Sequence, residues 1–367
     1  MDGMPTWPEV GERIAEARQA IGLSQGRLAE QVGLERTALV RIEAGDRRVT
    51  ALELFQLAEA LDVPAAHFVS RPPAALVSRR AALEEEADAA SRARYRLDAR
   101  LEAHARNAEW LVGHGFLHPP APDPAPARRG ETADPLALAR AARKAIGAPA
   151  GPLPALVDVA EALGLFLTVV DEEAEGASLL HDGYGVAVIT GRSAPARRRW
   201  TAAHELGHHL LQDKYHSDTG VSASRDEREQ LIDRFAGEFL LPEEDVRRAW
   251  QRIGPEQGVR STLIGLAADH RLSWSAVVAR ARQCELLDPA EARRIKADTP
   301  VRGDFLSVRG GEPAPDLPNG ATGRLWRRAV LRAWQDGAIT APRTVELLYG
   351  AVTEDDLPGR NLEDCSP

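Results

Sequence analysis

The segment His204-Glu205-Leu206-Gly207-His208 constrains this 367-residue chain more than any other part of it. Residues four positions apart on a helix share one face, so both imidazoles can reach a single cation. A catalytic zinc ion takes about three protein ligands and keeps one position for water, and Glu205 stands where a general base for that water would act. Because the pattern also occurs by chance, the residues around it must decide.

Two predicted helices surround this pattern. The stretch 196–212 holds no proline and carries apolar residues at helical spacing, which favours a largely buried helix with both histidines on its inner face. Glycine costs about 1 kcal/mol inside a helix, so Gly207 indicates close packing beside the site. A second helix is predicted over 225–241, ending near Pro242.

The second helix supplies the acidic residues that would complete a metal site. We expect Glu229 to be the third ligand and Asp233, one turn later, to orient a ligand imidazole by accepting its other N–H. Asp226 and Glu227 compete for the ligand role, and we expect both to face solvent instead. The pattern therefore predicts zinc bound by two histidines and one glutamate.

Other polar residues near the motif have open roles. Tyr184, Tyr215 and His216 are each candidates to stabilise an oxyanion, and the sequence does not choose among them. We expect His209 and His216 to be packed or surface histidines rather than metal ligands.

The two helices together resemble the ImmA/IrrE family of bacterial metallopeptidases. RRRWTAAHELGHHLL and the later ExxxDRFAGEFLLP are similar to the family's RFTxAHELGH and ExxxN-x-FAxxLLMP, within a region of about 137–287. The resemblance implies that His204, His208 and Glu229 bind zinc and that Glu205 is the catalytic glutamate. The Asp of ExxxD replaces the family's usual Asn, which makes this helix similar to the corresponding helix of gluzincins.

Length and composition limit the organisation of the chain. A chain of 367 residues, 44% of them hydrophobic, predicts two or three domains with cores of their own. Cys284 and Cys365 form neither a disulfide framework nor a metal-ligand cluster. The N-terminus is polar and no long apolar run follows, so we expect a bacterial cytoplasmic, nucleoid-associated protein with no membrane span. The net charge of −9 gives no general signal for nucleic acid.

Residues 1–70 predict a domain of short helices, five in number. Ser24 can cap a helix over 25–32, Gly33 makes a turn, and another helix follows over 35–44, which is helix-turn-helix geometry. The string LSQGRLAEQVGLERTALVRIEAGD resembles the Cro/C1-type, xenobiotic-response-element family of repressors. In that family the second of the paired helices enters the major groove of DNA.

The resemblance indicates which residues meet double-stranded DNA. The expected contacts at the paired helices are Gln25, Arg36, Thr37 and Arg41. Arg47 and Arg48, in the loop that follows, are expected to contact phosphates. The alternative is a surface helix pair used for protein contact, because residues 1–70 hold seven basic and eleven acidic residues. A clustered basic face would still permit DNA binding.

Residues 71–130 are predicted to form a helical and then proline-rich linker. Positions seven residues apart fall at Leu76, Leu83, Ala90, Leu97, His104 and Leu111. This repeat favours either a homodimerising helix over 76–111, which would give two DNA readers in one particle, or a helix packed along the chain's own domains. The sequence does not decide between them. The stretch 118–130 is predicted to be an extended, semi-rigid spacer.

Residues 131–290 are predicted to form a gluzincin-like zinc domain of the α+β type. The strands LFLTVV, GASLL and GVAVIT predict a small sheet beside the zinc helices, with a strand edge where an extended peptide can dock. Two helices over 263–287 are expected to cover the core, and a winged-helix-like element is the alternative.

Residues 291–367 are predicted to hold a loop over 298–323 and then a helical hairpin. The hairpin carries a basic stripe, which we expect to be a solvated face, at Arg324, Arg327, Arg328 and Arg332. The fold class is therefore mainly α with an α+β peptidase domain.

These expectations combine into a functional hypothesis. The chain is expected to be a DNA-binding transcriptional regulator whose zinc-dependent endopeptidase domain cleaves a repressor-like or antitoxin-like protein in a stress or mobile-element response. In one alternative the zinc domain is a non-catalytic sensor within a transcription factor. In another the chain is the antitoxin of a toxin–antitoxin pair.

Overall fold

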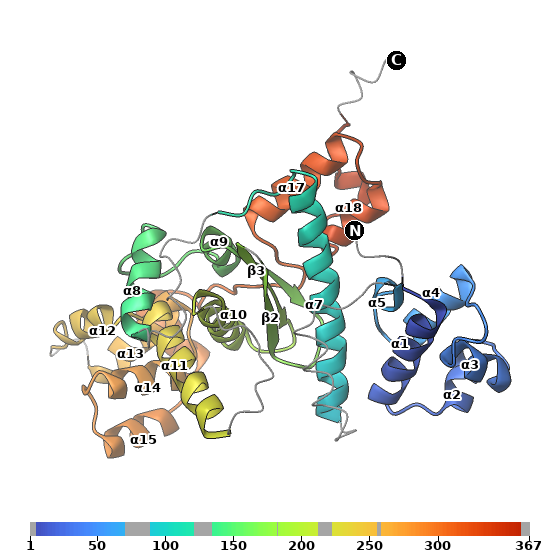
Figure 1. Ribbon diagram of the computed structural model, residues 1–367. Coiled ribbons are helices and arrows are strands. Elements are labelled where there is room, and N and C mark those ends of the chain that lie inside the picture. The colour runs from blue at the N-terminus through green and yellow to red at the C-terminus, as the bar shows by residue number, and fades with distance from the viewer. Residues whose placement is uncertain are drawn as a thin grey trace.

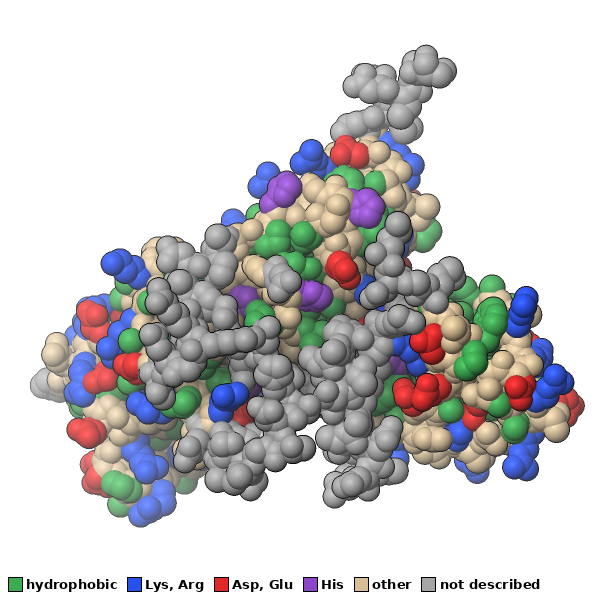
Figure 2. Space-filling view, in the orientation of Figure 1, with side chains coloured by type: hydrophobic (Ala, Val, Ile, Leu, Met, Phe, Trp, Pro, Cys, Tyr) green, Lys and Arg blue, Asp and Glu red, His purple; other side chains and the backbone are tan. Residues whose placement is uncertain are grey.

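The computed structural model describes residues 5–69, 89–120, 134–181, 183–211, 222–254 and 258–360, with the backbone alone for 89–91 and 222–227. The expectations for Leu76, Leu83, Tyr215, His216 and most of the proline-rich stretch lie outside these residues. Figure 1 shows helices around one small sheet, with the N-terminal domain at the right, as it is in the space-filling view of Figure 2. Among the helices of the described part, none combines the length and the apolar composition that a bilayer crossing requires.

The N-terminal domain has the five helices that the sequence predicts. They are α1 (Trp7–Ala20), α2 (Gln25–Gln31), α3 (Arg36–Glu43), α4 (Ala51–Ala60) and α5 (Ala66–Val69). Ser24 Oγ accepts a hydrogen bond from the backbone N–H of Arg27 at 3.2 Å and so begins α2. A Cβ on Gly11 would lie 2.2 Å from the carbonyl oxygen of Ile42, so α1 crosses α3 at a distance that only glycine allows.

A three-stranded sheet lies at the centre of the remaining chain. Its strands are β1 (Leu165–Val170), β2 (Gly176–His181) and β3 (Tyr184–Thr190), in the order β1-β3-β2, with β1 parallel and β2 antiparallel to β3. Alternate side chains of β3 belong to two different cores, one shared with α10 (Pro195–Leu210) and the other with α7 (Ala89–Gly113). The strand β2 forms an edge of the sheet and contacts α10.

Further helices complete the core on the α10 side. They are α8 (Pro135–Ala145), α9 (Leu156–Ala162), α11 (Ser222–Leu240), α12 (Glu243–Trp250), α13 (Val259–His270), α14 (Trp274–Gln283) and α15 (Pro289–Ala297). Leu263 of α13 and Val277 of α14 are fully buried in this core. The helix pair therefore covers the domain rather than projecting from it.

The expected loop over 298–323 is wrong in part, because it contains α16 (Arg302–Arg309). The carboxylate of Asp304 accepts from the backbone N–H of Val301 at 2.8 Å, which fixes the first turn. The same carboxylate pairs with Arg260 of α13 at 3.0 Å and ties the helix to the domain. Glycines inside and after this helix lower its intrinsic propensity, so tertiary contacts decide its fold.

The long helix α7 packs inside its own chain over 97–111, which is the second of the two alternatives that the repeat left open. Its repeat positions Leu97 and Leu111 are fully buried, and so are Leu101 and Ala108, which lie between them on the same helix. They pack against the sheet and against α17 (Arg324–Gln335), which is followed by α18 (Ala341–Leu347). His104, the polar position of the repeat, bonds to the carbonyl oxygen of Phe166 at 3.0 Å. These side chains are therefore not available as a seam between two copies.

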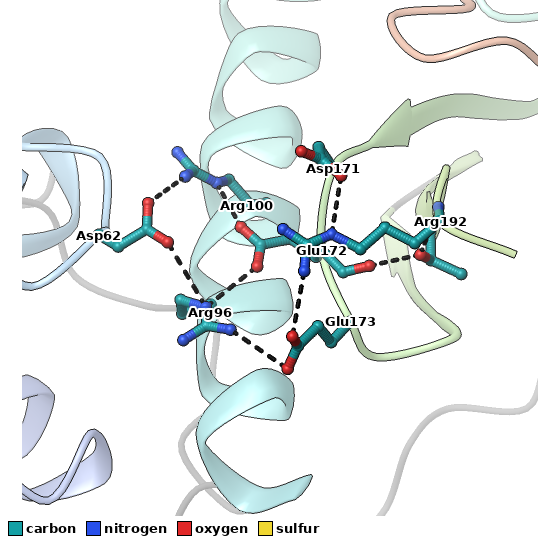
Figure 3. Close-up of polar contacts among 8 residues, drawn as sticks. Asp62, Arg96, Arg100, Asp171, Glu172, Glu173 and Arg192 are labelled. Atoms are coloured by element: carbon teal, nitrogen blue, oxygen red, sulfur yellow. Dashed lines mark hydrogen bonds and ion pairs between the residues drawn. The ribbon is translucent and has the colours of Figure 1, made fainter. Parts of the chain in front are cut away.

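The same helix joins the N-terminal domain to the sheet (Figure 3). Arg96 and Arg100 of α7 pair with Glu172, which follows β1, at 3.1 and 3.0 Å. Arg100 also reaches Asp62, which follows α4, at 2.9 Å. The helix α3, on which most of the expected base contacts lie, is on the side of the N-terminal domain away from α7 (Figure 1). The junction therefore leaves the expected DNA-binding face open.

The basic stripe of the C-terminal hairpin lies on α17. Arg324, Arg328 and Arg332 are exposed, as expected for a solvated face. Arg324 pairs with Asp158 at 3.1 Å, and this contact anchors the start of the helix to α9. The stripe is therefore partly used within the chain.

Candidate metal centre and DNA-facing residues

The helices α10 and α11 bring the candidate ligands together because they pack closely. A Cβ on Gly207 would lie 3.0 Å from Cγ2 of Ile232 and 3.1 Å from Cδ1 of Phe235, both on α11. This confirms the close packing that Gly207 indicates in the sequence. The helices can therefore present side chains to a common point.

Three potential ligand atoms converge at that point. His204, His208 and Glu229 place one donor atom each within 4.8 Å of one another. The two imidazole Nε2 atoms are 3.2 Å apart, and His204 Nε2 is 3.1 Å from Glu229 Oε2. Tetrahedral zinc with bonds near 2.0–2.1 Å holds neighbouring ligand atoms about 3.3 Å apart. The donor set and its spacing therefore fit a zinc ion.

Asp233 lies behind the first of these histidines. Its Oδ1 atom is 3.2 Å from His204 Nδ1, and the indole N–H of Trp200 donates to the same oxygen at 3.3 Å. This contact turns Nε2 of His204 toward the other ligands, which is how outer carboxylates orient metal-binding imidazoles. Burial lowers the pKa of His204, but hydrogen bonds to Asp233 and Glu229 outweigh it and raise the pKa to about 10. Without metal this imidazole therefore carries a proton that a cation would displace.

Glu205 is held by the edge strand β2. Its Oε2 atom accepts a hydrogen bond from the hydroxyl of Ser178 at 2.6 Å, and both side chains are almost fully buried. A Cβ on Gly176 would lie 2.8 Å from Glu205 Oε1, so the strand passes close beneath the carboxylate. Gly176 and Ser178 share one face of β2 because they are two residues apart. Sequence reasoning missed both, since nothing in GASLL marks which strand residues meet α10.

The other candidates for the site lie elsewhere or outside the described residues. Tyr184 packs in the core on the α7 face of the sheet and stacks on His181, with ring centroids 5.1 Å apart. Burial raises the pKa of Tyr184 to about 12. Because Tyr184 lies on the face of the sheet opposite to α10, it is no longer a candidate to stabilise an oxyanion. His209 is buried against the carbonyl oxygen of Leu163 at 3.1 Å, and burial lowers its pKa to about 4. The side chains of Asp226 and Glu227 are not among those described.

The expected DNA contacts divide into exposed and engaged residues. Arg36, Thr37, Arg41 and Arg48 are exposed. Gln25 donates to Glu43 at 2.8 Å, and this carboxylate is also bound by Arg18 at 2.6 Å. Arg47 pairs with Glu53 at 2.7 Å, which lowers the pKa of that carboxyl. The first turn of α3 therefore offers exposed cationic and hydroxyl groups, while Gln25 is held in a fixed orientation by Glu43.

Two family models match separate parts of the chain. Residues 14–68 match the helix-turn-helix model, and residues 163–282 match the IrrE N-terminal-like domain, the M78 peptidase family. The second match spans the sheet, both metal-site helices and most of α14.

Two similar proteins each match a short part of the chain. An uncharacterized transcriptional regulator in the ATPase CF(0) region of Rhodospirillum rubrum is 36% identical over 61 residues, which are 17% of this chain and 56% of that protein. The match thus spans about half the length of that relative. The restriction-modification controller protein C.AhdI from Aeromonas hydrophila is 37% identical over 17% of this chain and 94% of its own, with a TM-score of 0.17.

Proposed function

We propose that this chain, which joins a Cro/C1-type helix-turn-helix domain to an IrrE N-terminal-like domain of the M78 peptidase family, is a DNA-binding regulator that acts as a zinc-dependent endopeptidase. The observation that carries the proposal is the convergence of His204, His208 and Glu229, with Asp233 behind the first ligand. A carboxylate next to the first ligand, Glu205, supplies the base that hydrolysis needs.

Each residue of the site has a separate role in the proposed hydrolysis. A zinc ion bound by the three ligands would polarise the scissile carbonyl and lower the pKa of water. Glu205 takes the proton of the attacking water and later delivers it to the nitrogen of the leaving amine. Ser178 and Gly176 hold that carboxylate in place from below.

The edge of β2 offers a place for the substrate backbone. Thr190 N–H donates to the carbonyl oxygen of Glu175, so backbone groups of Ser178 and Leu180 point away from β3 in the antiparallel alternation. An extended peptide can add to this edge as a further strand. The peptide bonds of this added strand would then lie beside Glu205, which is hydrogen-bonded to Ser178 of β2.

The substrate class follows from the joined domains. Arg36, Thr37, Arg41 and Gln25 would read base edges of an operator, and Arg47 and Arg48 would contact its phosphates. A protease attached to such a reader has a high effective concentration at the operator. We therefore propose a repressor-like or antitoxin-like protein as the substrate, cleaved in a stress or mobile-element response.

The test uses the full chain and candidate regulators. Proteins captured from a bacterial lysate by the Glu205→Gln variant are incubated with the wild-type protein, once with zinc and once with a chelator. Cleavage that the chelator stops supports the endopeptidase. A metal-dependent change in DNA affinity without any cleavage would instead assign the zinc domain as a sensor.

A further inference from the structure

A cavity of about 680 Å³ lies beside the metal centre, lined by residues of α10, α11, α14 and α15. It shares Asp233 with that centre, because Asp233 lines the cavity and contacts His204 at 3.2 Å. Trp200 lines it as well and donates to Asp233. One carboxylate therefore separates the cavity from a metal ligand.

Cationic side chains dominate the charge of this cavity. Arg197, Arg234 and Lys296 line it, and Asp233 is the one acidic residue among the lining residues described. Arg197 is already paired with Glu175 at 2.6 Å. Within the described part of the chain, neither Arg234 nor Lys296 has a carboxylate within ion-pair distance. A chain of net charge −9 thus carries a locally positive hollow at this place.

The neutral lining adds hydrogen-bond donors. Ser273 and Ser275 contribute hydroxyls that lie 3.2 Å from each other, and Gln230 contributes an amide. A carboxylate that entered the cavity would exchange water for charge-assisted hydrogen bonds, which are the stronger kind.

We propose that this cavity is a specificity pocket for an acidic side chain, Asp or Glu, of the polypeptide substrate. The proposal rests on the proposed function, because it places the substrate's scissile bond at the metal centre. Asp233 follows Glu229 by one helical turn, about 5.4 Å, and an extended peptide advances about 3.3 Å per residue. One helical turn corresponds to about two residues of extended peptide, so the acidic residue lies about two residues or more from the scissile bond, always on the same side.

The position of the cavity favours a peptide side chain over a free anion. Arg197 lines the cavity and pairs with Glu175, the residue directly before β2, so the cavity lies near one end of the strand edge proposed for the substrate. An acidic residue on the same chain arrives already tethered, so its binding costs less entropy than that of a separate molecule.

The test reads cleavage sites in a proteome-derived peptide library, using the full zinc-loaded protein. We expect the wild type to prefer Asp or Glu at one fixed position by roughly tenfold to a hundredfold in kcat/KM, and Arg234→Glu and Lys296→Glu to lose this preference while still cleaving. Arg294→Glu makes the same charge change on an exposed residue of α15 outside the cavity lining, and it should keep the preference. Thermal melts of all variants check that each is folded.

Two results would overturn the pocket: cleavage with no acidic preference, or a preference that survives in Arg234→Glu. A binding measurement separates this from failure of the proposed function. A fluorescent peptide with three Glu residues should bind full-length Glu205→Gln protein more tightly than its Gln counterpart, and Arg234→Glu should remove the difference. Equal binding of the two peptides, with inorganic phosphate bound in an Arg234-dependent way, would assign the cavity to a small anion instead.

Discussion

Ser178 gives the residue-scale account its sharpest test. Its hydroxyl donates to Glu205 at 2.6 Å in a nearly dry environment, so its loss frees the carboxylate to turn. We expect Ser178→Ala to lower kcat by roughly tenfold or more with little change in KM, because the hydrogen bond positions the base and does not bind substrate. Ser178→Thr keeps the hydroxyl and should retain most of the activity. Equal kcat for wild type and Ser178→Ala would remove this positioning role.

Asp233 is the second test at the level of single residues. Its contact with His204 Nδ1 orients the imidazole, so we expect Asp233→Asn to weaken zinc binding by about 10- to 100-fold. Competition with a chromophoric chelator measures this affinity directly. Asp298→Asn removes the same charge from an exposed residue that pairs with Arg260, and it should leave zinc affinity unchanged. An unchanged affinity in Asp233→Asn would contradict the role of the contact.

Residues on helices were easier to place from sequence than residues on the sheet. Helical periodicity puts His204 and His208 on one face, and the apolar pattern of the next helix carries Glu229 to the same side. Ser178 and Gly176 contact Glu205 only because β2 packs against α10. The sequence of a short strand does not indicate which helix it packs against. Local pattern thus predicts the ligand cluster, while the support of Glu205 depends on tertiary contact.

At the scale of elements, α7 shows that a seven-residue repeat does not by itself identify the surface that it packs against. Apolar residues at seven-residue spacing form a stripe along one side of a helix, and that stripe can pack against another helix or against a sheet. In this chain it packs against the sheet. We expect Leu101→Ala to lower the free energy of unfolding by about 2–5 kcal/mol, while Glu109→Ala on the exposed side of α7 has little effect. Urea unfolding checks the energies, and sedimentation checks the mass. If Leu101→Ala kept the stability of the wild type but sedimented with a smaller mass, α7 would be a dimer interface instead.

His104 on the same helix makes stability depend on pH. Burial lowers the pKa of His104 to about 4, against a backbone hydrogen bond to Phe166 that raises it. The unfolded chain binds a proton below about pH 6.5 and the folded chain does not until about pH 4, so stability falls as pH drops through this window. The loss should reach roughly 3 kcal/mol from this group. Unfolding by urea at several pH values should show a shallower slope for His104→Gln than for wild type.

At the scale of the whole molecule, the order of parts was predictable and their assembly was not. Turn residues, caps and hydrophobic periods predict the five-helix domain, the strands and the paired helices in their correct order. The predicted helix of the linker lies between the N-terminal domain and the sheet, where Arg96 and Arg100 bind Glu172 on one side and Asp62 on the other. Such ion pairs join residues far apart in sequence, and no local pattern indicates them.

The central claim is that Glu205 and the neighbouring metal ligands hydrolyse a peptide bond. Wild-type and Glu205→Gln proteins are brought to equal zinc content and incubated with the same peptide library, and new amino termini are quantified by mass spectrometry. The account predicts that the variant keeps close to one zinc per chain while its rate of cleavage falls by about 10²- to 10⁴-fold. Cleavage by the variant at the wild-type rate would contradict it.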